Sequence, residues 1–515
     1  MPNEKRVLRF AVIDPGASQP QVRPNQLTAV LRADRWDDFG YKTMYDVVLW
    51  VEGNGIELGR VKILQLGQTQ GRPDLPRRFD TGLGIAFCSI GQDIEYYQKL
   101  LEVPEGIRKR YLVGIRDAAY DPITEGSFRN EDGWATSLLR FGQAVNALKD
   151  GRKLVRGEEL STDRLSFVFE WNRNGSVAEI PFIFDDSKHL PGRMHTLIGY
   201  NGVGKTTLLA DLAMAAREGA ADGKPNNTDK LSIISGKDST FGAVIAVSYS
   251  AFDTFRTPES VRGKTGFDAA QNAYFGYVYC GLRRSVNNDG GSTFELKSIE
   301  EIRSEFAAAL NTAGRRESRG HLQEALETLS HEPSFGVAGV DLSTLGAGLD
   351  SAGAVEAFNG LSTGHKIVVN IVAQLAAHLR TRSLVLIDEP ETHLHPPLVA
   401  ALLRSIQLLL KLHGSFAILA THSPVVVQEL PGRYVRMLER TGNSISLREP
   451  EVETFAENIG SITRHVFSLD NTSTDYQGIL NSLSKRFTLE EIEGMFENGL
   501  SVQGRALVAH YRRLA

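Results

Sequence analysis

The first part of the chain mixes patterns typical of strands with patterns typical of helices. Residues 46–51 and 56–64 are rich in apolar side chains and flank Glu-Gly-Asn-Gly, a sequence that favours a tight hairpin turn. Residues 94–101 place Ile, Tyr and Leu at helical spacing. We therefore expect residues 1–155 to form an α+β region, and none of its segments matches a catalytic motif.

From about residue 160 the pattern becomes that of a sheet flanked by helices. Short apolar runs predict buried strands, and longer amphipathic stretches predict helices between them. The fold class is therefore α/β, with a mixed sheet covered by helices. The predicted strands are 165–171, 180–184, 194–199, 242–249, 384–387 and 416–420, and the predicted helices are 206–216, 364–380 and 396–412.

Two stretches depart from this alternation. Residues 217–240 are polar and are expected to form a loop. Residues 255–355 resemble an insertion, which we expect to be mostly helical because apolar residues recur at helical spacing near 299–310 and 322–329. The expected divisions of the chain are 1–155, 160–254, 255–355, 356–445 and a helical 446–515, with 160–254 and 356–445 as two lobes of one domain.

Composition narrows the class of protein. A length of 515 residues suggests two to four domains, and 42% apolar residues are enough for a large core. A net charge of −5 excludes a generic polycation but not a local basic groove. Cys88 and Cys280 cannot form a disulfide framework, and no apolar run approaches the length of a membrane span. We therefore expect a cytoplasmic protein without a signal peptide or membrane anchor.

Residues 199–206 match the phosphate-binding loop G-x-x-x-x-G-K-[ST] without a mismatch, between an apolar strand and a helix. The glycines let backbone N–H groups surround phosphates, and the following helix points its positive end at them. We predict a site for ATP and Mg²⁺, with a chance glycine-rich turn as the alternative. The predicted nucleotide-binding residues are Gly199, Asn201, Gly202, Val203, Gly204, Lys205, Thr206 and Thr207, and the hydroxyl of Thr206 is also a predicted Mg²⁺ ligand.

Two acids, Asp388 and Glu389, follow the apolar run 384–387. In an open α/β sheet, ligands bind at the carboxyl ends of the strands, which is where these acids stand. We expect Asp388 to hold Mg²⁺ through water and Glu389 to polarise the attacking water as a catalytic residue. The alternative is a strand end with two solvated acids, and the preceding phosphate loop disfavours it.

Two further segments complete a set of four. Residues 361–365 (LSTGH) open a predicted helix, with Ser362 standing 26 positions before Asp388 (388 − 362). Residues 421–424 (THSP) follow a predicted strand, with His422 standing 34 positions after Asp388 (422 − 388). The order of phosphate loop, signature, strand with two acids and histidine resembles that of the ABC-type ATPases over about 165–440.

That resemblance implies an ABC-type P-loop ATPase head with a helical insertion and an α+β N-terminal region. It also implies a mechanism in which two heads close face to face on two ATP molecules. The signature residues Ser362, Thr363 and Gly364 of one head would then contact the γ-phosphate bound by the other. His422 would act as a catalytic histidine beside Glu389, and the chain would form homodimers or higher oligomers of dimers.

The departures from the family pattern indicate a branch of it. Thr363 and His365 replace a Gly and a Gln of the signature, His395 replaces an Asp, and no Gln follows the strand at 242–249. This set resembles the OLD-related soluble ATPases of bacterial anti-phage defence, the Septu ATPases in particular. The resemblance implies a sensor or regulatory subunit that controls a separate effector, a nuclease, and that meets nucleic acid through that complex.

Several alternatives stay open. An SMC-like DNA-repair ATPase requires a long coiled coil, whereas the 157 positions from Lys205 to Ser362 (362 − 205) lack sustained heptads. A transporter ATPase subunit fits poorly with the atypical signature and the large N-terminal region. A scaffold with an inactive site is a further option. Glu391, His393 and His395 have the chemistry of zinc ligands, but a further soft ligand is missing nearby.

Overall fold

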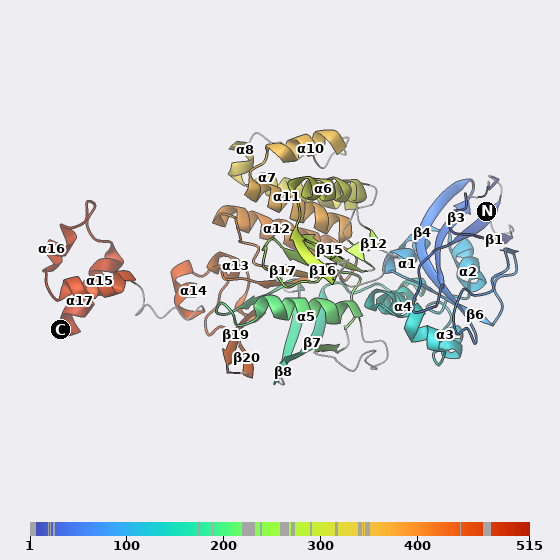
Figure 1. Cartoon of the computed structure of the whole chain (residues 1–515), viewed down its shortest axis with the longest axis horizontal. Helices are drawn as coiled ribbons and strands as arrows, with labels where there is room; N and C mark the ends of the chain where they lie inside the picture. The colour runs from blue at the N-terminus through green and yellow to red at the C-terminus, as the bar shows by residue number, and fades with distance from the viewer. Residues whose placement is uncertain are drawn as a thin grey trace.

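The computed structural model describes residues 7–514, except for 19, 21, 24–25, 174–175, 188, 219–231, 237–238, 258–266, 269–272, 275, 289–290, 315–317, 338–341, 343–344, 346–350, 443 and 467–474. In the described chain an N-terminal α+β unit lies beside a larger three-layer unit, and a small helical bundle follows at the other end (Figure 1).

The N-terminal unit is a six-stranded sheet with the strand order β5-β1-β2-β3-β4-β6, packed against helices. The predicted hairpin is present, because Glu52 and Gly53 adopt positive φ angles of 53° and 85° and reverse the chain between β3 and β4. The strands are β1 (Leu8–Ile13), β2 (Leu27–Ala33), β3 (Met44–Val51), β4 (Asn54–Gln65), β5 (Arg78–Phe79) and β6 (Phe87–Gly91), and the helices are α1 (Ile94–Glu102), α2 (Glu105–Gly114), α3 (Pro122–Phe128) and α4 (Gly142–Val155).

A buried ion pair lies inside this unit. Lys62 Nζ is 2.7 Å from Asp38 Oδ2, and both side chains are fully buried. Lys62 also donates to the carbonyl oxygen of Ser137 at 2.7 Å, and Arg140 reaches Asp38 Oδ1 at 2.8 Å. Burial lowers the pKa of Lys62 to about 8, and the attraction of Asp38 opposes that shift. The two charges therefore depend on each other in the folded chain.

The larger unit is built on a nine-stranded sheet with the order β12-β13-β14-β11-β17-β18-β9-β19-β20. Its six middle strands, from β14 to β19, run parallel. The strands are β9 (Met194–Ile198), β11 (Val244–Ser248), β12 (Phe267–Asp268), β13 (Ala273–Tyr274), β14 (Tyr277–Gly281), β17 (Leu384–Asp388), β18 (Phe416–Ala420), β19 (Val435–Thr441) and β20 (Ser444–Arg448).

Helices and a second sheet cover the two faces of this central sheet (Figure 1). In β17, Leu384 and Leu386 belong to the core shared with α5, whereas Val385 and Ile387 belong to the core shared with α11 and α12. Successive side chains of a strand point to opposite faces, so an all-apolar run such as this one is buried on both sides. One face is covered by α5 (Lys205–Glu218) and by a sheet of β10 (Ser232–Ser235), β7 (Arg164–Arg173) and β8 (Ser176–Asp185). The other is covered by α6 (Ile299–Gly314), α7 (Ser318–Ser330), α8 (Pro333–Val337), α10 (Ser351–Gly360), α11 (Thr363–His378) and α12 (Pro396–Leu412).

Two segments differ from the sequence-based expectation. The first part of the expected helical insertion is strand: β14 joins the central sheet beside β11, and β15 (Arg283–Asn288) and β16 (Gly291–Leu296) form a hairpin. All five residues of β14 are buried. Its aromatic and β-branched side chains favour a strand when they pack in a buried sheet. Within the expected loop 217–240, β10 (Ser232–Ser235) pairs with β7 (Arg164–Arg173), whose other neighbour is β8 (Ser176–Asp185); residues 219–231 lie outside the described chain.

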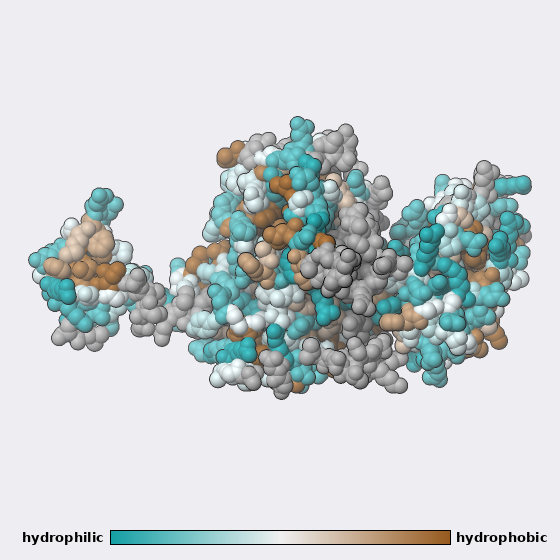
Figure 2. Space-filling view, in the orientation of Figure 1, coloured by the Kyte–Doolittle hydropathy of each residue, from teal (hydrophilic) through white to brown (hydrophobic). Residues whose placement is uncertain are grey.

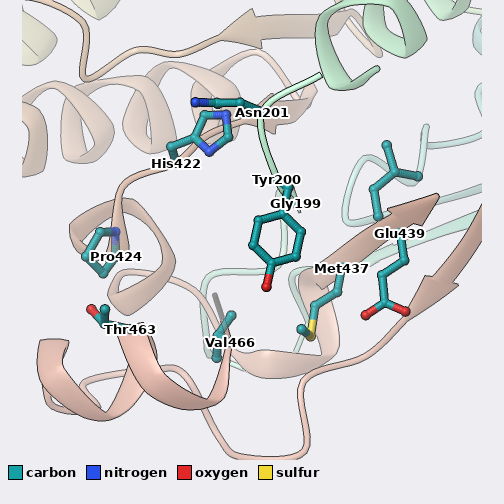
Figure 3. Close-up of a pocket in the computed structure, with 10 residues that line it drawn as sticks. Gly199, Tyr200, Asn201, His422, Pro424, Met437, Glu439, Thr463 and Val466 are labelled. Carbon is teal, nitrogen blue, oxygen red and sulfur yellow. The ribbon is translucent and has the colours of Figure 1, made fainter. Parts of the chain in front are cut away.

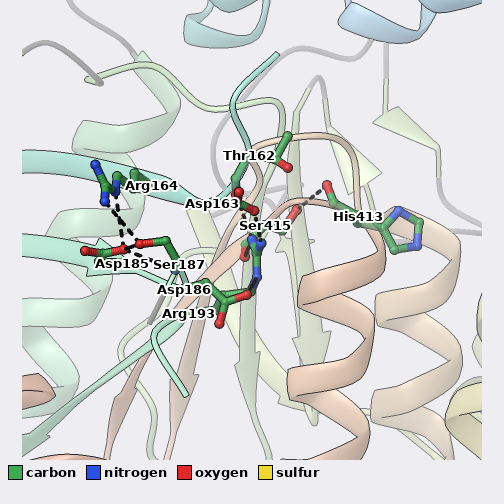
Figure 4. A network of polar contacts seen from close by, with 9 residues as sticks. All are labelled: Thr162, Asp163, Arg164, Asp185, Asp186, Ser187, Arg193, His413 and Ser415. Carbon is green, nitrogen blue, oxygen red and sulfur yellow. Dashed lines mark hydrogen bonds and ion pairs between the residues drawn. The ribbon is translucent and has the colours of Figure 1, made fainter. Parts of the chain in front are cut away.

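Arg193 joins the second sheet to the central sheet at the end away from the phosphate loop. Its Nε atom is 2.7 Å from Asp186 Oδ2, and its Nη2 atom is 3.3 Å from Asp163 Oδ1 (Figure 4). Its Nη1 atom donates to the carbonyl oxygens of Thr162 at 2.8 Å and Ser415 at 3.4 Å. The buried guanidinium is thus compensated, and it holds β7 and β8 against the starts of β9 and β18.

The N-terminal unit contacts the loop after α11. Arg380 Nε is 2.8 Å from Glu95 Oε1 of α1, and Gln98 donates to Thr381 Oγ1 at 3.1 Å. Arg382 Nε lies 3.6 Å from Asp150 Oδ2 of α4. These polar contacts are made at the strand end opposite the phosphate loop, because Arg382 lies two residues before the buried start of β17.

The C-terminal helices form a small bundle with a core of its own, made of Leu480, Ile492, Leu500 and Val508. Apolar side chains also gather on its outside (Figure 2). A patch of exposed apolar side chains is a common mark of an interaction surface. The helices are α15 (Asp475–Ser484), α16 (Leu489–Glu493) and α17 (Val502–Leu514), preceded along the chain by α13 (Pro424–Gln428) and α14 (Ile459–His465).

Both cysteines, Cys88 and Cys280, are buried as free thiols. Among the described helices, none combines the length and the apolar character needed to cross a bilayer.

Candidate functional site

The glycine-rich loop 199–206 connects β9 to α5 at the carboxyl edge of the central sheet. Two of its glycines are required by geometry. A Cβ atom at Gly199 would lie 2.4 Å from the carbonyl oxygen of Leu438, and Gly204 has a φ of +107°, which side chains disfavour. The loop therefore brings its backbone to the start of α5, where the helix presents unpaired N–H groups.

The order of the strands explains why distant residues meet at this loop. β18 lies between β9 and β17, so the residue that follows β18 comes to lie between the residues that follow the other two. Lys205 Nζ is accordingly 2.5 Å from His422 Nε2, and His422 Nε2 is 3.5 Å from Glu389 Oε1. Lys205 also donates to the carbonyl oxygen of Gly199 at 2.9 Å.

The pKa values of Lys205 and His422 are both lowered at this site. Burial lowers the pKa of Lys205 to about 8, and Glu389, Asp388 and Glu391 oppose the shift. Burial also lowers the pKa of His422, and the nearby Lys205 charge lowers it further. Neutral His422 is thus able to accept a hydrogen bond from the Lys205 ammonium group.

Thr206 and Asp388 meet directly. The Thr206 hydroxyl lies 2.9 Å from Oδ2 and 3.0 Å from Oδ1 of Asp388. Burial raises the pKa of Asp388 to about 7, the Thr206 hydrogen bond opposes the shift, and the neighbouring Glu389 adds to it. A carboxylate whose charged form is disfavoured by burial is stabilised by a bound cation.

Glu389 has a strained backbone. Its φ is +47°, which is uncommon for a residue with a side chain and costs about 1–3 kcal/mol. The conformation is held by its own N–H, which donates to the carbonyl oxygen of Ala420 at 2.8 Å. Glu389 keeps a partly exposed carboxylate beside His422, and strain of this kind concentrates at functional sites.

Glu391 has a positioning role that the sequence analysis did not foresee. Its Oε1 atom accepts from the Thr421 hydroxyl at 2.6 Å and from the backbone N–H of His422 at 2.8 Å. These contacts fix the turn after β18, from which the imidazole of His422 extends. The sequence shows that an acid stands two positions after Glu389. It does not show which groups donate hydrogen bonds to that acid.

His395 is a helix cap in this structure. Its Nδ1 atom accepts from the backbone N–H of Leu398 at 3.2 Å, so it begins α12 in the place where a short acid often does. Glu391 is committed to Thr421 and His422, and within the described residues no group of three or more His, Cys, Asp or Glu side chains is arranged to hold a metal. The structure therefore gives no support for the zinc alternative.

The signature residues start α11 and contact their own neighbourhood. Ser362 is the N-cap of α11, and its Oγ atom is 2.8 Å from His365 Nδ1. A Cβ at Gly364 would lie 3.2 Å from the carbonyl oxygen of His393, so this turn packs closely on the start of α12. The described contacts of Ser362 and Gly364 are with these neighbours, and none joins them to the phosphate loop of the same chain.

Two hollows lie on either side of the phosphate loop. One, of about 360 Å³, is lined by Gly199, Tyr200 and Asn201 together with His422 (Figure 3). The other, of about 90 Å³, is lined by loop residues Gly202, Val203, Gly204 and Thr207, with Trp171, Arg173, Arg440 and Ile445 around them. Arg173 and Arg440 were missed by sequence reasoning, because β7 and β19 bring them to the loop from distant parts of the chain.

The segment after β11 contains no glutamine at 249–257, and its acid, Asp253, raises the pKa of Asp388 through its negative charge. Ser248 pairs with Asp388 across neighbouring strands. Asp253 is buried, accepts from the Tyr279 hydroxyl at 2.8 Å and is 3.0 Å from Arg283 Nη1. Arg283 is thereby engaged within the chain.

The chain aligns with protein ea59 of Escherichia phage lambda, with 31% identity over 539 residues, covering 98% of each protein. The chain belongs to the ea59 family. Residues 263–428 of this ea59-family protein also match a domain model described as an AAA domain, putative AbiEii toxin, Type IV TA system. The matched region includes the start of α11, β17 and β18. Over these residues the ea59-family chain is similar to an AAA-type domain.

Among solved structures, the ea59-family chain is similar to MJ1267, an ATP-binding cassette of an ABC transporter, in its ADP conformation. The identity is 15% and the TM-score is 0.30, and the match covers 59% of this chain and 97% of MJ1267. It is also similar to the SmcHead bound to the C-winged helix domain of ScpA, with 12% identity, a TM-score of 0.27 and coverage of 56% and 97%.

Proposed function

We propose that the chain binds and hydrolyses ATP in a Mg²⁺-dependent way and uses the cycle as a conformational switch. The observation that carries the proposal is the convergence of Lys205, the Thr206–Asp388 pair and the Glu389–His422 pair at one edge of the sheet. Each pair joins residues from distant parts of the chain, which a chance glycine-rich turn does not require.

The residues around the loop fit a triphosphate with its cation. Backbone N–H groups at 199–206 and the guanidinium groups of Arg173 and Arg440 present positive charge. Among the described residues, the buried Nη1 atom of Arg173 has no hydrogen-bond partner. The carboxylate of Asp388, whose pKa burial raises to about 7, would be stabilised by a bound cation. In the proposed complex, Thr206 and Asp388 hold Mg²⁺, and Lys205 contacts the terminal phosphates.

The contacts of the free chain suggest how its own residues act in the cycle. Bound Mg²⁺·ATP supplies the phosphoanhydride bond and a cation that neutralises phosphate charge. Lys205 leaves its contact with His422 in order to reach phosphate, which frees the imidazole. Glu389 then orients and polarises the attacking water, and His422, held through its backbone by Glu391, hydrogen-bonds the transferred phosphoryl group.

We further propose that ATP closes two copies face to face, with Ser362, Thr363 and Gly364 of one copy completing the site of the other. The support is that these residues form a helix N-terminus, and such an end binds anions. Among the described contacts, those of Ser362 and Gly364 do not reach the loop of their own chain. ATP binding would stabilise the closed dimer, and hydrolysis would release it.

The biological role we propose is that of a sensor or regulatory subunit in anti-phage defence, controlling a separate nuclease. The matched domain model, described as a putative AbiEii toxin, and a relative encoded by phage lambda support a place in phage–host conflict. The replacements at Thr363, His365 and His395 favour the OLD-related branch, near the Septu ATPases. Purification of the tagged chain from its native host is expected to recover a nuclease, and recovery of a membrane permease instead would contradict this role.

Lys205→Ala tests the nucleotide site. Loss of a charge-assisted contact worth roughly 1.5–3 kcal/mol is expected to weaken ATP binding about 10- to 100-fold in calorimetry. Lys411→Ala, on an exposed position of α12, is the matched control and should bind ATP normally. Unchanged ATP affinity in Lys205→Ala would reject the proposed site.

Glu389→Gln tests the hydrolytic step. The amide is a much weaker base, so we expect ATP to bind, turnover to fall at least about 100-fold and closed dimers to accumulate in sedimentation experiments. Glu324→Gln, on the exposed face of α7, serves as the matched control. Normal turnover in Glu389→Gln would show that Glu389 is not the base that polarises the attacking water.

A further inference from the structure

A chain of four polar side chains connects the signature serine to the insertion. Ser362 Oγ lies 2.8 Å from His365 Nδ1, and His365 Nε2 lies 2.7 Å from Ser334 Oγ in α8. The Ser334 hydroxyl and its backbone N–H both donate to Glu332 Oε2, the latter at 2.9 Å. His365 and Glu332 are buried, and the Phe335 ring packs against the imidazole with 4.3 Å between centroids.

The donors and acceptors along this chain can be counted. An ionised carboxylate only accepts, so the single hydroxyl proton of Ser334 goes to Glu332. Ser334 Oγ must then accept from His365, which places the proton of the neutral imidazole on Nε2. His365 Nδ1 is left as an acceptor, and the Ser362 hydroxyl donates to it.

The Ser362 hydroxyl is therefore fully used in the free chain. Its single proton points to His365 Nδ1, and its oxygen accepts from the backbone N–H of His365 at 3.4 Å. A phosphate oxygen, which only accepts, would find no proton available on this hydroxyl. Protonated imidazole donates from both nitrogens, so Nδ1–H would donate to Ser362 Oγ and the hydroxyl proton would be free to turn outward.

We propose that His365 is a positioning residue that controls, by gaining or losing one proton, whether the Ser362 hydroxyl donates to an anion. The proposal rests on the function proposed above, in which that anion is the γ-phosphate of ATP held by a second copy. The proton comes from solvent as the two copies associate, and it returns to solvent when they separate. Ser334 and Glu332 fix the tautomer and connect this step to the insertion.

The surroundings of the imidazole suit such a switch. Burial lowers the pKa of His365, Glu332 from the turn between α7 and α8 raises it, and His395 from the start of α12 lowers it. The imidazole is thus mainly neutral at pH 7 in the free chain. A phosphate arriving at Ser362 would favour the charged form, so association would take up protons.

The test is sedimentation equilibrium of the full chain with Mg²⁺ and the non-hydrolysable analogue AMP-PNP between pH 6 and pH 8.5. With Mg²⁺·AMP-PNP saturating at every pH, the association constant of the wild type is expected to rise as pH falls, by up to about tenfold per pH unit for each proton taken up. His365→Gln should still associate, but its association constant should lose the part of the pH dependence that His365 causes. The reason is that the glutamine amide N–H₂ donates to Ser362 at every pH. His321→Gln, on α7 beside His413, is the matched control and should keep the wild-type slope.

Calorimetry in buffers of different ionisation enthalpy counts the protons directly. Lys205, Asp388 and His422 titrate in both proteins, so the difference between wild type and His365→Gln isolates His365, and we expect it to approach one proton per chain. Ser334→Ala provides a second variant. Without its acceptor at Nε2, the imidazole can carry its proton on Nδ1, and the pH slope should shrink with His365 still in place.

The outcomes separate the two proposals. Equal pH slopes and equal proton uptake in wild type and His365→Gln, with AMP-PNP-driven association intact, would overturn the role of His365 alone. Absence of AMP-PNP-driven association at every pH in the wild type would overturn the proposed dimer switch, and this inference with it.

Discussion

Removing the carboxylate of Glu391 should uncouple ATP hydrolysis from ATP binding. Glu391 accepts hydrogen bonds from the Thr421 hydroxyl at 2.6 Å and from the backbone N–H of His422 at 2.8 Å. Among the described hydrogen bonds and ion pairs, none joins Glu391 to the phosphate loop or to Asp388, although its charge raises the pKa of Lys205. In Glu391→Ala the turn that carries His422 loses both contacts. We expect the imidazole to sample several positions, while the loop at 199–206 keeps its shape.

The magnitude follows from these two hydrogen bonds. A hydrogen bond to a charged group contributes about 1.5–3 kcal/mol, and water entering the partly open site recovers part of that. A net cost of about 2–4 kcal/mol in holding His422 corresponds to a turnover about 30- to 700-fold lower, at 1.4 kcal/mol per factor of ten. Glu391→Gln keeps one acceptor oxygen and should lose less than about tenfold, and Thr421→Val removes one of the two contacts and should fall between the other variants.

The assay is single-turnover hydrolysis of ATP, with equilibrium ATP binding measured in parallel. Binding should stay within about threefold of wild type in all three variants, and thermal melting should show that each is folded. A Glu391→Ala protein that hydrolyses ATP within threefold of the wild-type rate would refute the view that this acid positions His422. A parallel loss of binding would place Glu391 in the nucleotide site itself.

Three further predictions follow from the same structure. Affinity for Mg²⁺·ATP should be highest between about pH 7 and pH 8, because Asp388, with its pKa raised to about 7, takes up a proton below that range and Lys205, with its pKa lowered to about 8, loses one above it. In calorimetry from pH 6 to pH 9, Asp388→Asn should flatten the acid side, and full wild-type affinity at pH 6 would contradict the assignment. Lys62→Ala should lower the free energy of unfolding of the N-terminal unit in urea by about 3 kcal/mol, because Asp38 stays buried with less compensating charge, and a loss below 1 kcal/mol would speak against that coupling. His395→Ala should lower the free energy of unfolding by about 1 kcal/mol, whereas His395→Asp should lower it little, and EDTA should not change either result. Stabilisation of the wild type by zinc would instead support a metal-binding role for His395.

Structural features that depend on residues close together in the sequence could be predicted from the sequence alone. The glycine-rich loop acts through its own backbone and the helix that follows it, so its eight consecutive residues are enough to predict phosphate binding. The all-apolar run at 384–387 identified a strand buried on both faces, and the structure has it as β17 in the middle of the sheet. The segment around β14 was misjudged because a five-residue strand in a poorly patterned region gives little periodicity, and only its place beside β11 decided its conformation.

The sequence alone determined that this chain contains a phosphate loop, a buried strand ending in two acids and a helix that begins with serine, because each depends on interactions between near neighbours. Tertiary structure decided which residues meet. The order of the parallel strands put His422 between Lys205 and Glu389, and packing of the insertion put Ser334 beside His365. Such contacts join residues that are far apart in the chain, and their free energy is gained only when the whole sheet and its covering helices assemble.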